Sequence, residues 1–324
     1  MLSTEYILKT VEAETAKIYF DMQPRSLFVP IEYILSIGGK HIRPALTLIA
    51  CNIFSEAVDN AIKPALGLEV FHNFTLLHDD LMDQADKRRN RPTVHKKWNN
   101  NTAILSGDAM VIAAYRLISE TPEPHLKKVL DLFSQTAMEI CCGQQYDMDF
   151  EQRNDVREDE YIEMIRLKTA VLMACCLKTG AIVGGAREKD ADRLYRFGIN
   201  IGLAFQLQDD LLDVYGDSAT FGKNIGGDIL CDKKTFLLIN ALRLANPSQK
   251  AAIERFNSSN SFEPLDKITT YTEIYNALNI KEITLKKIDC YYQLAMTELE
   301  SLEAEPASLT ELNKFAKMLT SRET

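Results

Sequence analysis

Two stretches of the chain each carry three aspartates with the same spacing. One is "LLHDDLMD" (76 to 83) and the other is "FQLQDDLLD" (205 to 213). On a helix the first and third aspartates lie four residues apart on one face, with the second on the flank. Several carboxylates beside apolar residues require a cation, and Mg²⁺ binds carboxylates while keeping positions for water and phosphate. Two such helix ends facing each other can hold two or three divalent ions, which in turn bind a diphosphate. The carboxylates that could bind these ions are Asp79, Asp80 and Asp83 in the first stretch and Asp209, Asp210 and Asp213 in the second.

Basic residues lie where loops can bring them to the same anion. Arg88 and Arg89 follow the first aspartate group, and their planar guanidinium groups can bind phosphate directly. "GGKHIRP" (38 to 44) places Lys40 and Arg43 beside a double glycine. His72 lies seven residues before Asp79 on the same helical face. Taken singly, each lysine or arginine reads as a solvated side chain and His72 as a core histidine. Further lysines stand in "RLKTA" and "FGKNIGGDILCDKK": Lys168, Lys223, Lys233 and Lys234.

The elements that must position these residues are helices. Apolar residues recur at helical spacing almost throughout, as in "VLDLFSQTAMEICCG" (129 to 143), and no run indicates a strand with confidence. Loops are predicted at 20–27, 84–95, 119–125, 153–158, 215–235 and 257–265. None has the composition of an interdomain linker. We therefore predict one all-α domain over residues 1–324, a bundle of about ten or more helices.

Composition excludes several classes of protein. The chain has 324 residues, 46% of them hydrophobic, which is enough to bury a large core. Its net charge of −9 argues against nucleic acid as a partner. Seven cysteines without CxxC spacing indicate neither a disulfide framework nor a zinc site. The N-terminal residues lack a secretory pattern and no long apolar run follows, so a cytoplasmic protein without a membrane span is expected.

Taken in order, the motifs resemble those of one family. GGKHIRP, EVFHNFTLLHDDLMD, RRNRPTVH, GQQYDMD, KTA, FQLQDDLLD and GKNIGGDI…KKT run through nearly the whole chain. This set is similar to that of the trans-isoprenyl diphosphate synthases, the superfamily of farnesyl and geranylgeranyl diphosphate synthases. The resemblance implies an all-α isoprenoid synthase fold with the two aspartate motifs facing each other across a central cavity. It also implies a homodimer that uses two or three Mg²⁺ ions per active site.

The resemblance assigns a role to each motif residue. Asp79, Asp83 and Asp209 are the main magnesium ligands that it implies, with Asp80 and Asp213 supporting them. The implied ligands of the allylic diphosphate are Arg88, Lys168, Lys223 and Lys233. Those of isopentenyl diphosphate are Lys40, Arg43, His72 and Arg89. The groups implied around the reacting carbons are Lys168, Thr169, Gln206 and Lys233.

Three positions depart from the usual family pattern. His41 stands where arginine is common, Asn90 replaces the glycine of RRGxPT, and Asp232 replaces an asparagine before Lys233. None of them removes a predicted ligand. They put the loop conformations and the reach of Lys233 in question.

The implied chemistry is head-to-tail condensation of isopentenyl diphosphate with an allylic diphosphate. Ionisation gives an allylic carbocation, the double bond attacks it, and loss of a proton yields a chain five carbons longer. An aromatic residue five positions before the aspartate motif, with a small residue at four, is typical of a short-chain enzyme that stops at C15 or C20. The predicted floor of the product cavity is Phe71, Phe74 and Thr75.

Three other readings stay open. A long-chain polyprenyl synthase shares every motif and differs in the depth of the product cavity. A terpene cyclase shares the first aspartate motif, but its second metal motif is of the NSE type, whereas this chain has DDLLD. A non-catalytic partner subunit typically loses an aspartate motif, and both are present here.

Overall fold

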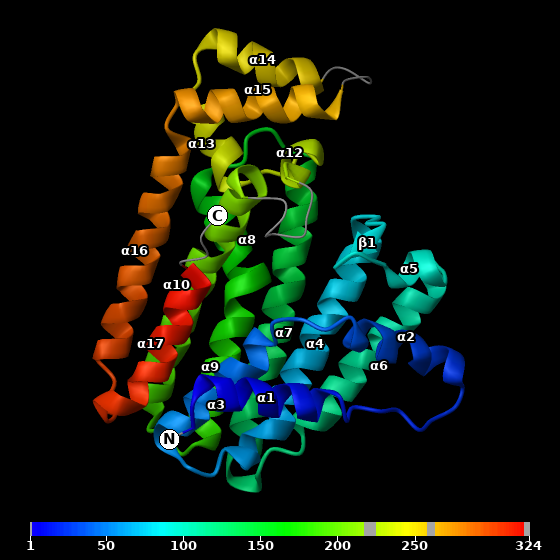
Figure 1. Ribbon diagram of the computed structural model, residues 1–324, viewed down its shortest axis with the longest axis vertical. Helices are drawn as coiled ribbons and strands as arrows, with labels where there is room; N and C mark the ends of the chain where they lie inside the picture. Colours follow the sequence, from blue (N-terminus) through cyan, green and yellow to red (C-terminus); the bar gives the residue numbers. More distant parts are fainter. Residues whose placement is uncertain (1, 217–224, 258–262, 321–324) are drawn as a thin grey trace. The chain divides into compact units, whose positions relative to one another are not determined.

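The computed structural model describes residues 2–216, 225–257 and 263–320, and helices dominate that part of the chain (Figure 1). A 3₁₀ turn, η1, spans Val58–Ala61, and a π-helical turn, η2, spans Arg166–Ala170. The helices are α1 (Thr4–Thr15), α2 (Arg25–Ser36), α3 (Ile42–Phe54), α4 (Ile62–Met82), α5 (Val94–Lys97), α6 (Asn100–Ile118), α7 (Glu123–Glu151), α8 (Glu158–Ile165), α9 (Val171–Val183), α10 (Glu188–Tyr215), α12 (Gly227–Leu230), α13 (Phe236–Leu244), α14 (Pro247–Asn257), α15 (Pro264–Ala277), α16 (Ile280–Glu300) and α17 (Pro306–Thr320). The all-α prediction is confirmed.

The described residues contain one small β-hairpin, inside the predicted loop 84–95. Strands β1 (Lys87–Arg88) and β2 (Arg91–Pro92) are antiparallel, with Arg88 opposite Arg91. Two-residue strands are too short to produce an alternating pattern, so the sequence did not reveal them. Helix α12 likewise lies within the predicted loop 215–235.

Contacts divide the chain into two compact units. Unit 1 contains residues 1–136, 172–196 and 301–315, and unit 2 contains residues 137–171, 197–300 and 316–324. Each unit is built from segments that are distant in the sequence. The expectation of a single domain remains a prediction.

In unit 1, α4 is the central helix. It packs along α6 and also contacts α3 and α2 (Figure 1). Its buried residues, among them Leu68, Val70, Phe71 and Leu77, point in several directions, as expected of a helix that neighbours surround. The first aspartate motif occupies the last turn of this helix. A helix that packs against several neighbours therefore carries these carboxylates.

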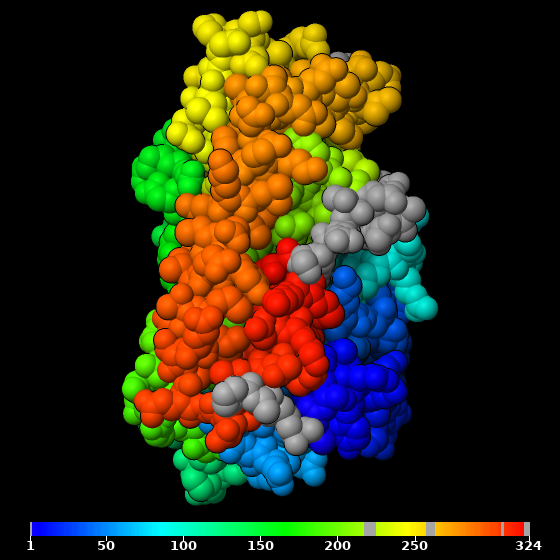
Figure 2. Space-filling view, turned by 60° about the vertical axis from the view of Figure 1, so that its left-hand side comes forward, coloured from blue at the N-terminus to red at the C-terminus, as the bar shows by residue number. Residues whose placement is uncertain are grey.

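In unit 2, the second half of α10 packs into a core formed with α8, α13, α15 and α16. Leu207, Leu211, Phe236, Tyr271 and Ile280 are among its buried members. Helices α15 and α16 form part of the surface of this unit (Figure 2). The second aspartate motif thus ends a helix whose apolar face is fixed in a core.

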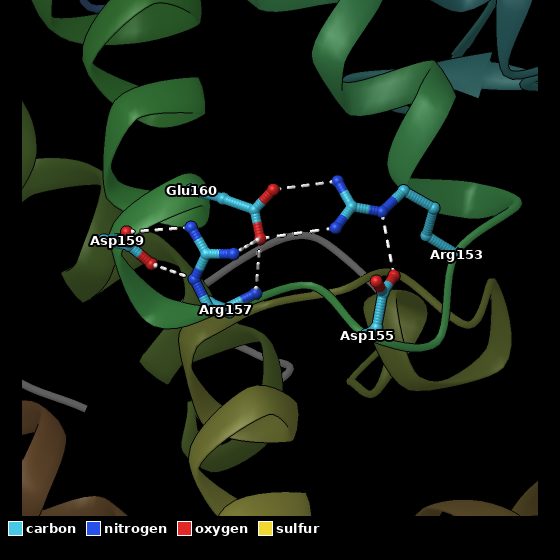
Figure 3. Close-up of polar contacts among 5 residues, drawn as sticks. All are labelled: Arg153, Asp155, Arg157, Asp159 and Glu160. Atoms are coloured by element: carbon cyan, nitrogen blue, oxygen red, sulfur yellow. Dashed lines mark hydrogen bonds and ion pairs between the residues drawn. The ribbon is translucent and has the colours of Figure 1, made fainter.

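Charged residues hold the start of α8 (Figure 3). Glu160 accepts a hydrogen bond from the backbone N–H of Arg157, at 3.0 Å, and another from Nη1 of Arg153, at 2.9 Å. Arg153 also pairs with Asp155 and Arg157 with Asp159. The shared Glu160 caps the first turn of α8 and ties it to the preceding segment.

None of the helices in the described ranges is both long enough and apolar enough to span a membrane.

Candidate active site

At the end of α4, neighbouring aspartates have different surroundings. Asp80 is buried, and both of its oxygens accept hydrogen bonds from the guanidinium of Arg88, from Nε and Nη2 at 2.8 Å each. Asp79 is more exposed, and its Oδ2 lies 3.9 Å from Nη2 of Arg88. Asp83 is the C-terminal cap of the helix. Burial raises the pKa of Asp80, while the hydrogen bonds from Arg88 act in the opposite direction.

The hairpin after α4 places the two arginines. Arg89 and Asn90 have φ angles of 49° and 61°, the left-handed values that a two-residue hairpin turn requires. Asparagine tolerates this conformation better than most residues, so Asn90 can take the place of the usual glycine. The guanidinium of Arg89 lies against Gly39, since a Cβ added there would lie 2.8 Å from Nη1. This contact brings Arg89 to the segment that carries Lys40.

A histidine and an arginine of the predicted isopentenyl diphosphate set are in direct contact. Nη1 of Arg43 lies 2.9 Å from Nε2 of His72. Burial lowers the pKa of His72 well below its usual value, and the charges of Arg43, Arg89 and Arg88 lower it further. The imidazole is therefore neutral, and its Nε2 accepts the hydrogen bond from Arg43.

His41 has a structural partner. It precedes α3 with a φ of 45°, and its Nδ1 lies 3.0 Å from Oε1 of the buried Glu69 on α4. This pair links the Gly38–His41 segment to α4. The departure at position 41 is thus accommodated by contacts within unit 1.

In unit 2, the aspartates of the second motif likewise differ in how deeply they are buried. Asp210 is 4% exposed. It accepts hydrogen bonds from the hydroxyl of Tyr161 and from Nε2 of Gln206. Burial raises the pKa of Asp210 to about 8, with a further contribution from the charge of Asp228. Oδ2 of Asp213 accepts from the backbone N–H of Asp228 at 3.0 Å.

The π-helical turn η2 carries Lys168 and Thr169. Glycines on two neighbouring helices allow the close packing of this turn. A Cβ at Gly143 on α7 would lie 2.4 Å from the backbone nitrogen of Lys168, and one at Gly202 on α10 would lie 2.5 Å from Cα of Ala170. Both distances are shorter than a carbon side chain can make, so the turn is held between two bare backbones. π-helical turns are frequent at functional sites.

Side chains of η2 reach toward α7 and α10. Nζ of Lys168 donates to Oδ2 of Asp147 at 2.6 Å, and the hydroxyl of Thr169 donates to Oε1 of Gln206 at 3.0 Å. The structure therefore brings together three of the four residues predicted around the reacting carbons, namely Lys168, Thr169 and Gln206.

The fourth, Lys233, follows a residue with an unusual conformation. Asp232 has a φ of 55°, and its Oδ1 accepts from Nζ of Lys267 at 2.8 Å. Lys267 lies on α15 and is fully buried. The backbone N–H of Lys233 donates to the carbonyl of Asp228. The acidic side chain at position 232 thus forms an ion pair that anchors this segment to α15.

The predicted floor residues belong to an aromatic cluster in unit 1. The ring of Phe71 lies 5.3 Å from that of Phe74 and 5.0 Å from that of Phe133. Phe74 also contacts the ring of His78, at 4.8 Å, and is only partly buried. The hydroxyl of Thr75 donates to the carbonyl of His72. Phe71 is a core residue, whereas Phe74 retains exposed surface.

Comparisons with known proteins identify the family. A family model described as polyprenyl synthetase matches residues 24–275. This chain belongs to the polyprenyl synthetase family. It is 40% identical to a geranylgeranyl diphosphate synthase of Methanosarcina mazei over 68% of each chain. It is 35% identical to a short chain isoprenyl diphosphate synthase of Methanothermobacter thermautotrophicus, over 89% of this chain and 88% of the other. A crystal structure of a geranylgeranyl pyrophosphate synthase matches with a TM-score of 0.92 and 40% identity over all of both chains.

Membership of the polyprenyl synthetase family confirms three predictions from the sequence: the trans-isoprenyl diphosphate synthase family, its fold, and an enzyme of the prenyltransferase class. The individual ligand assignments remain predictions. Lys223 lies outside the described residues. Within the described ranges, no three His, Cys, Asp or Glu side chains already converge as a metal site.

Three residues of this polyprenyl synthetase were missing from the predicted site. Asp147, the partner of Lys168, stands in the motif GQQYDMD and Asp228 in GKNIGGDI, so both motifs could have indicated them. Tyr161 has no such signal. Its hydroxyl matters only because the fold buries it against Asp210.

Proposed function

We propose that this chain is a short-chain trans-prenyltransferase. It condenses isopentenyl diphosphate head-to-tail with dimethylallyl, geranyl or farnesyl diphosphate to give C15 and C20 diphosphates. The observation that carries the proposal is the pair of aspartate-ended helices. Asp80 of α4 binds two nitrogen donors of the Arg88 guanidinium. Helix α10 carries Gln206, which accepts from Thr169 beside Lys168 on η2. Relatives named as geranylgeranyl and short chain isoprenyl diphosphate synthases support it.

The allylic diphosphate is held by basic side chains and by Mg²⁺ ions. Asp79, Asp83 and Asp209 supply hard oxygen donors of the kind that Mg²⁺ prefers. The oxygens of Asp80 already accept from Arg88, and Oδ2 of Asp213 accepts from the backbone of Asp228. These two aspartates therefore support the site from hydrogen-bonded positions. Two or three Mg²⁺ ions supply Lewis-acid stabilisation of the leaving diphosphate when bound.

Isopentenyl diphosphate binds separately, without metal, at Lys40, Arg43, His72 and Arg89. The contacts between Arg43 and His72, and between Arg89 and Gly39, support this grouping. A neutral His72 that accepts from Nη1 of Arg43 fixes the orientation of this guanidinium, whose planar N–H groups suit phosphate oxygens.

The chain's own residues manage the reacting carbons. Arg88, Lys168, Lys223 and Lys233 bind the departing diphosphate. Oxygen atoms of Thr169 and Gln206 carry partial negative charge and stabilise the allylic cation. The proton lost after condensation passes to the departing diphosphate, so no side chain is needed as a general base.

Product length is set by Phe74, with Phe71 and Thr75 around it. The partly buried ring of Phe74 is held between Phe71 and His78, so it cannot easily move aside. This supports an enzyme that stops at C15 or C20.

The active form is a homodimer in the cytoplasm. Leu105 and Ile112, seven residues apart on one face of α6, are 60% and 63% exposed. Large exposed apolar side chains two turns apart on one helix face favour burial against a second copy.

The cytoplasmic location is proposed from the cysteines. All seven are free thiols, in keeping with a reducing compartment.

The test is product length. Purified protein is incubated with isopentenyl diphosphate, each allylic primer in turn and Mg²⁺, and the products are identified by mass spectrometry after dephosphorylation. C15 or C20 products that disappear with EDTA are expected. Products of C30 or longer would contradict the short-chain reading, and no product from any primer would favour a non-catalytic partner subunit.

A further inference from the structure

Four side chains of unit 2 form a continuous hydrogen-bonded series. The hydroxyl of Thr169 donates to Oε1 of Gln206, and Nε2 of Gln206 donates to Oδ1 of Asp210 at 3.0 Å. Oδ2 of Asp210 accepts from the hydroxyl of Tyr161. Asp210 and Tyr161, 4% and 2% exposed, are shielded from water. The series therefore runs from a residue proposed to face the reacting carbons into the core.

Asp210, near the buried end of the series, determines which groups donate and which accept. An amide side chain has a donor end and an acceptor end, and a half-turn exchanges them. Oδ2 of Asp210 is engaged with the hydroxyl of Tyr161 whether the carboxyl is charged or carries a proton on Oδ2, so Oδ1 presents an acceptor to Gln206. The NH₂ group of Gln206 must face this acceptor, so its Oε1 faces Thr169. The hydroxyl of Thr169 then donates inward, and the lone pairs of its oxygen point away from Gln206.

We propose that Asp210 and Tyr161 are positioning residues for the condensation. They keep the oxygen of Gln206, and through it the oxygen of Thr169, oriented so that negative ends of dipoles meet the allylic cation. If the amide were turned, Thr169 would accept from NH₂ and its proton would be directed outward. A positive hydrogen atom would then face the developing cation, which raises the barrier to ionisation.

Tyr161 is itself held in place by its helix. It follows Glu160, whose carboxylate caps the first turn of α8 and binds Arg153 (Figure 3). Its ring lies in the core of unit 2 with Met164 and Leu207. The hydroxyl therefore has little freedom to leave Asp210.

This inference rests on the proposed function and assigns to Asp210 a role other than metal binding. A magnesium ligand needs a charged carboxylate, whereas a positioning residue needs one acceptor atom opposite Gln206. Asparagine at position 210 keeps that acceptor, because its NH₂ group can donate to the oxygen of Tyr161 while its Oδ1 accepts from Gln206. Leucine has a similar shape and offers no acceptor. The two substitutions separate the two roles.

The experiment compares kcat and KM of the full-length wild type with those of Asp210→Leu and Asp210→Asn. Asp210→Leu should lower kcat about tenfold to a hundredfold and leave KM for isopentenyl diphosphate within about twofold. Asp210→Asn should retain kcat within about threefold. If Asp210→Asn loses as much as Asp210→Leu, charge is the property that matters and the inference is overturned.

A double-mutant cycle shows whether Asp210 acts through Gln206. Gln206→Ala should lower kcat, and adding Asp210→Leu to it should cause little further loss. Multiplied losses, or no loss in Gln206→Ala, would contradict the proposal. Asp190→Asn is the matched control, because Asp190 is a buried aspartate of α10 whose partners Arg187 and Arg193 belong to unit 1. Its kcat should stay at the wild-type value.

Tyr161→Phe keeps the ring and provides a second variant if Asp210→Leu does not fold. Its kcat should fall several-fold, while Tyr275→Phe, at another fully buried tyrosine of unit 2, should leave kcat unchanged. Wild-type kcat in Tyr161→Phe would remove Tyr161 from the proposal. Wild-type kcat in Asp210→Leu would overturn the inference alone, whereas a wild-type protein that makes no product would overturn the proposed function and the inference together.

Discussion

Adjacent aspartates at the end of α4 have different tasks. Asp80 orients Arg88 through two hydrogen bonds, whereas Asp79 is more exposed and lies farther from that guanidinium. The second motif shows the same division, with Asp210 buried against Tyr161. Within each motif, the most buried carboxylate thus binds other side chains of the protein and fixes their positions. At the scale of single residues, the consequences can be tested at Arg88, Phe74 and His72.

Arg88→Lys should lower kcat/KM for the allylic diphosphate about tenfold or more. An ammonium group cannot reproduce the two parallel hydrogen bonds that the Arg88 guanidinium donates to Asp80. Steady-state kinetics with varied allylic substrate measure this effect. Arg91→Lys, at an exposed arginine on the same hairpin, is the control and should match the wild type. Equal kcat/KM values for the two variants would mean that the paired hydrogen bonds between Arg88 and Asp80 have no role in binding or reaction of the allylic diphosphate.

Phe74→Ala should lengthen the product by at least one isoprene unit, because it removes the partly buried ring in front of Phe71. Mass spectrometry of the dephosphorylated products measures the change. Phe197→Leu, in a fully buried position elsewhere, controls for general loosening of the fold and should leave product length unchanged. An unchanged distribution in Phe74→Ala would show that the floor lies elsewhere.

His72 makes stability depend on pH. Its pKa is well below 6.5 in the folded protein, so the unfolded chain binds the extra proton first as pH falls. The free energy of unfolding should therefore decrease below pH 6.5, by up to about 1.4 kcal/mol per pH unit from this residue. Urea unfolding at pH 7.5 and 5.5 should show a smaller decrease for His72→Gln than for the wild type. Equal decreases would exclude His72 as the source.

At the scale of elements, the position of η2 depends on bare backbone in α7 and α10. The turn carries Lys168 and Thr169, and it contacts Gly143 and Gly202 more closely than any side chain would permit. The side chains of η2 that are proposed to be catalytic are therefore placed by helix packing as much as by their own conformations.

Gly143→Ala should reduce both stability and activity. The added methyl group would meet backbone atoms of Leu167 and Lys168, which can give way only if η2 shifts. We expect a loss of about 1–3 kcal/mol in the free energy of unfolding, together with a lower kcat. Chemical denaturation and kinetics measure the two effects. Cys142→Ala, at the exposed neighbouring residue of α7, should behave as the wild type. Unchanged kcat in Gly143→Ala would show that η2 tolerates the shift.

At the scale of the whole molecule, the proposed homodimer accounts for the exposed apolar side chains of α6. Ile112→Asp should shift the protein from dimer to monomer, because burying an unpaired carboxylate in an interface is costly. Sedimentation velocity measures the oligomeric state. Leu285→Asp replaces an exposed leucine of α16 and should leave the dimer intact. A dimer that survives Ile112→Asp would place the interface on another surface.

The sequence alone determined the helical class, the two aspartate motifs and the basic residues near them. Helical periodicity and the spacing of charges are local properties that neighbouring residues in the chain already display. They indicate a helical protein with a metal-dependent diphosphate site, and the resemblance of the motifs to known synthases indicates the family and its chemistry.

The tertiary structure alone decided which member of each motif is buried and what it contacts. The pairs Asp80–Arg88, Lys168–Asp147 and Asp232–Lys267, and the series from Thr169 to Tyr161, join residues that the sequence does not pair. Burial and hydrogen-bond partners depend on residues far apart in the chain, so no local pattern encodes them. For this reason Tyr161 and Lys267 could be recognised only in the folded protein.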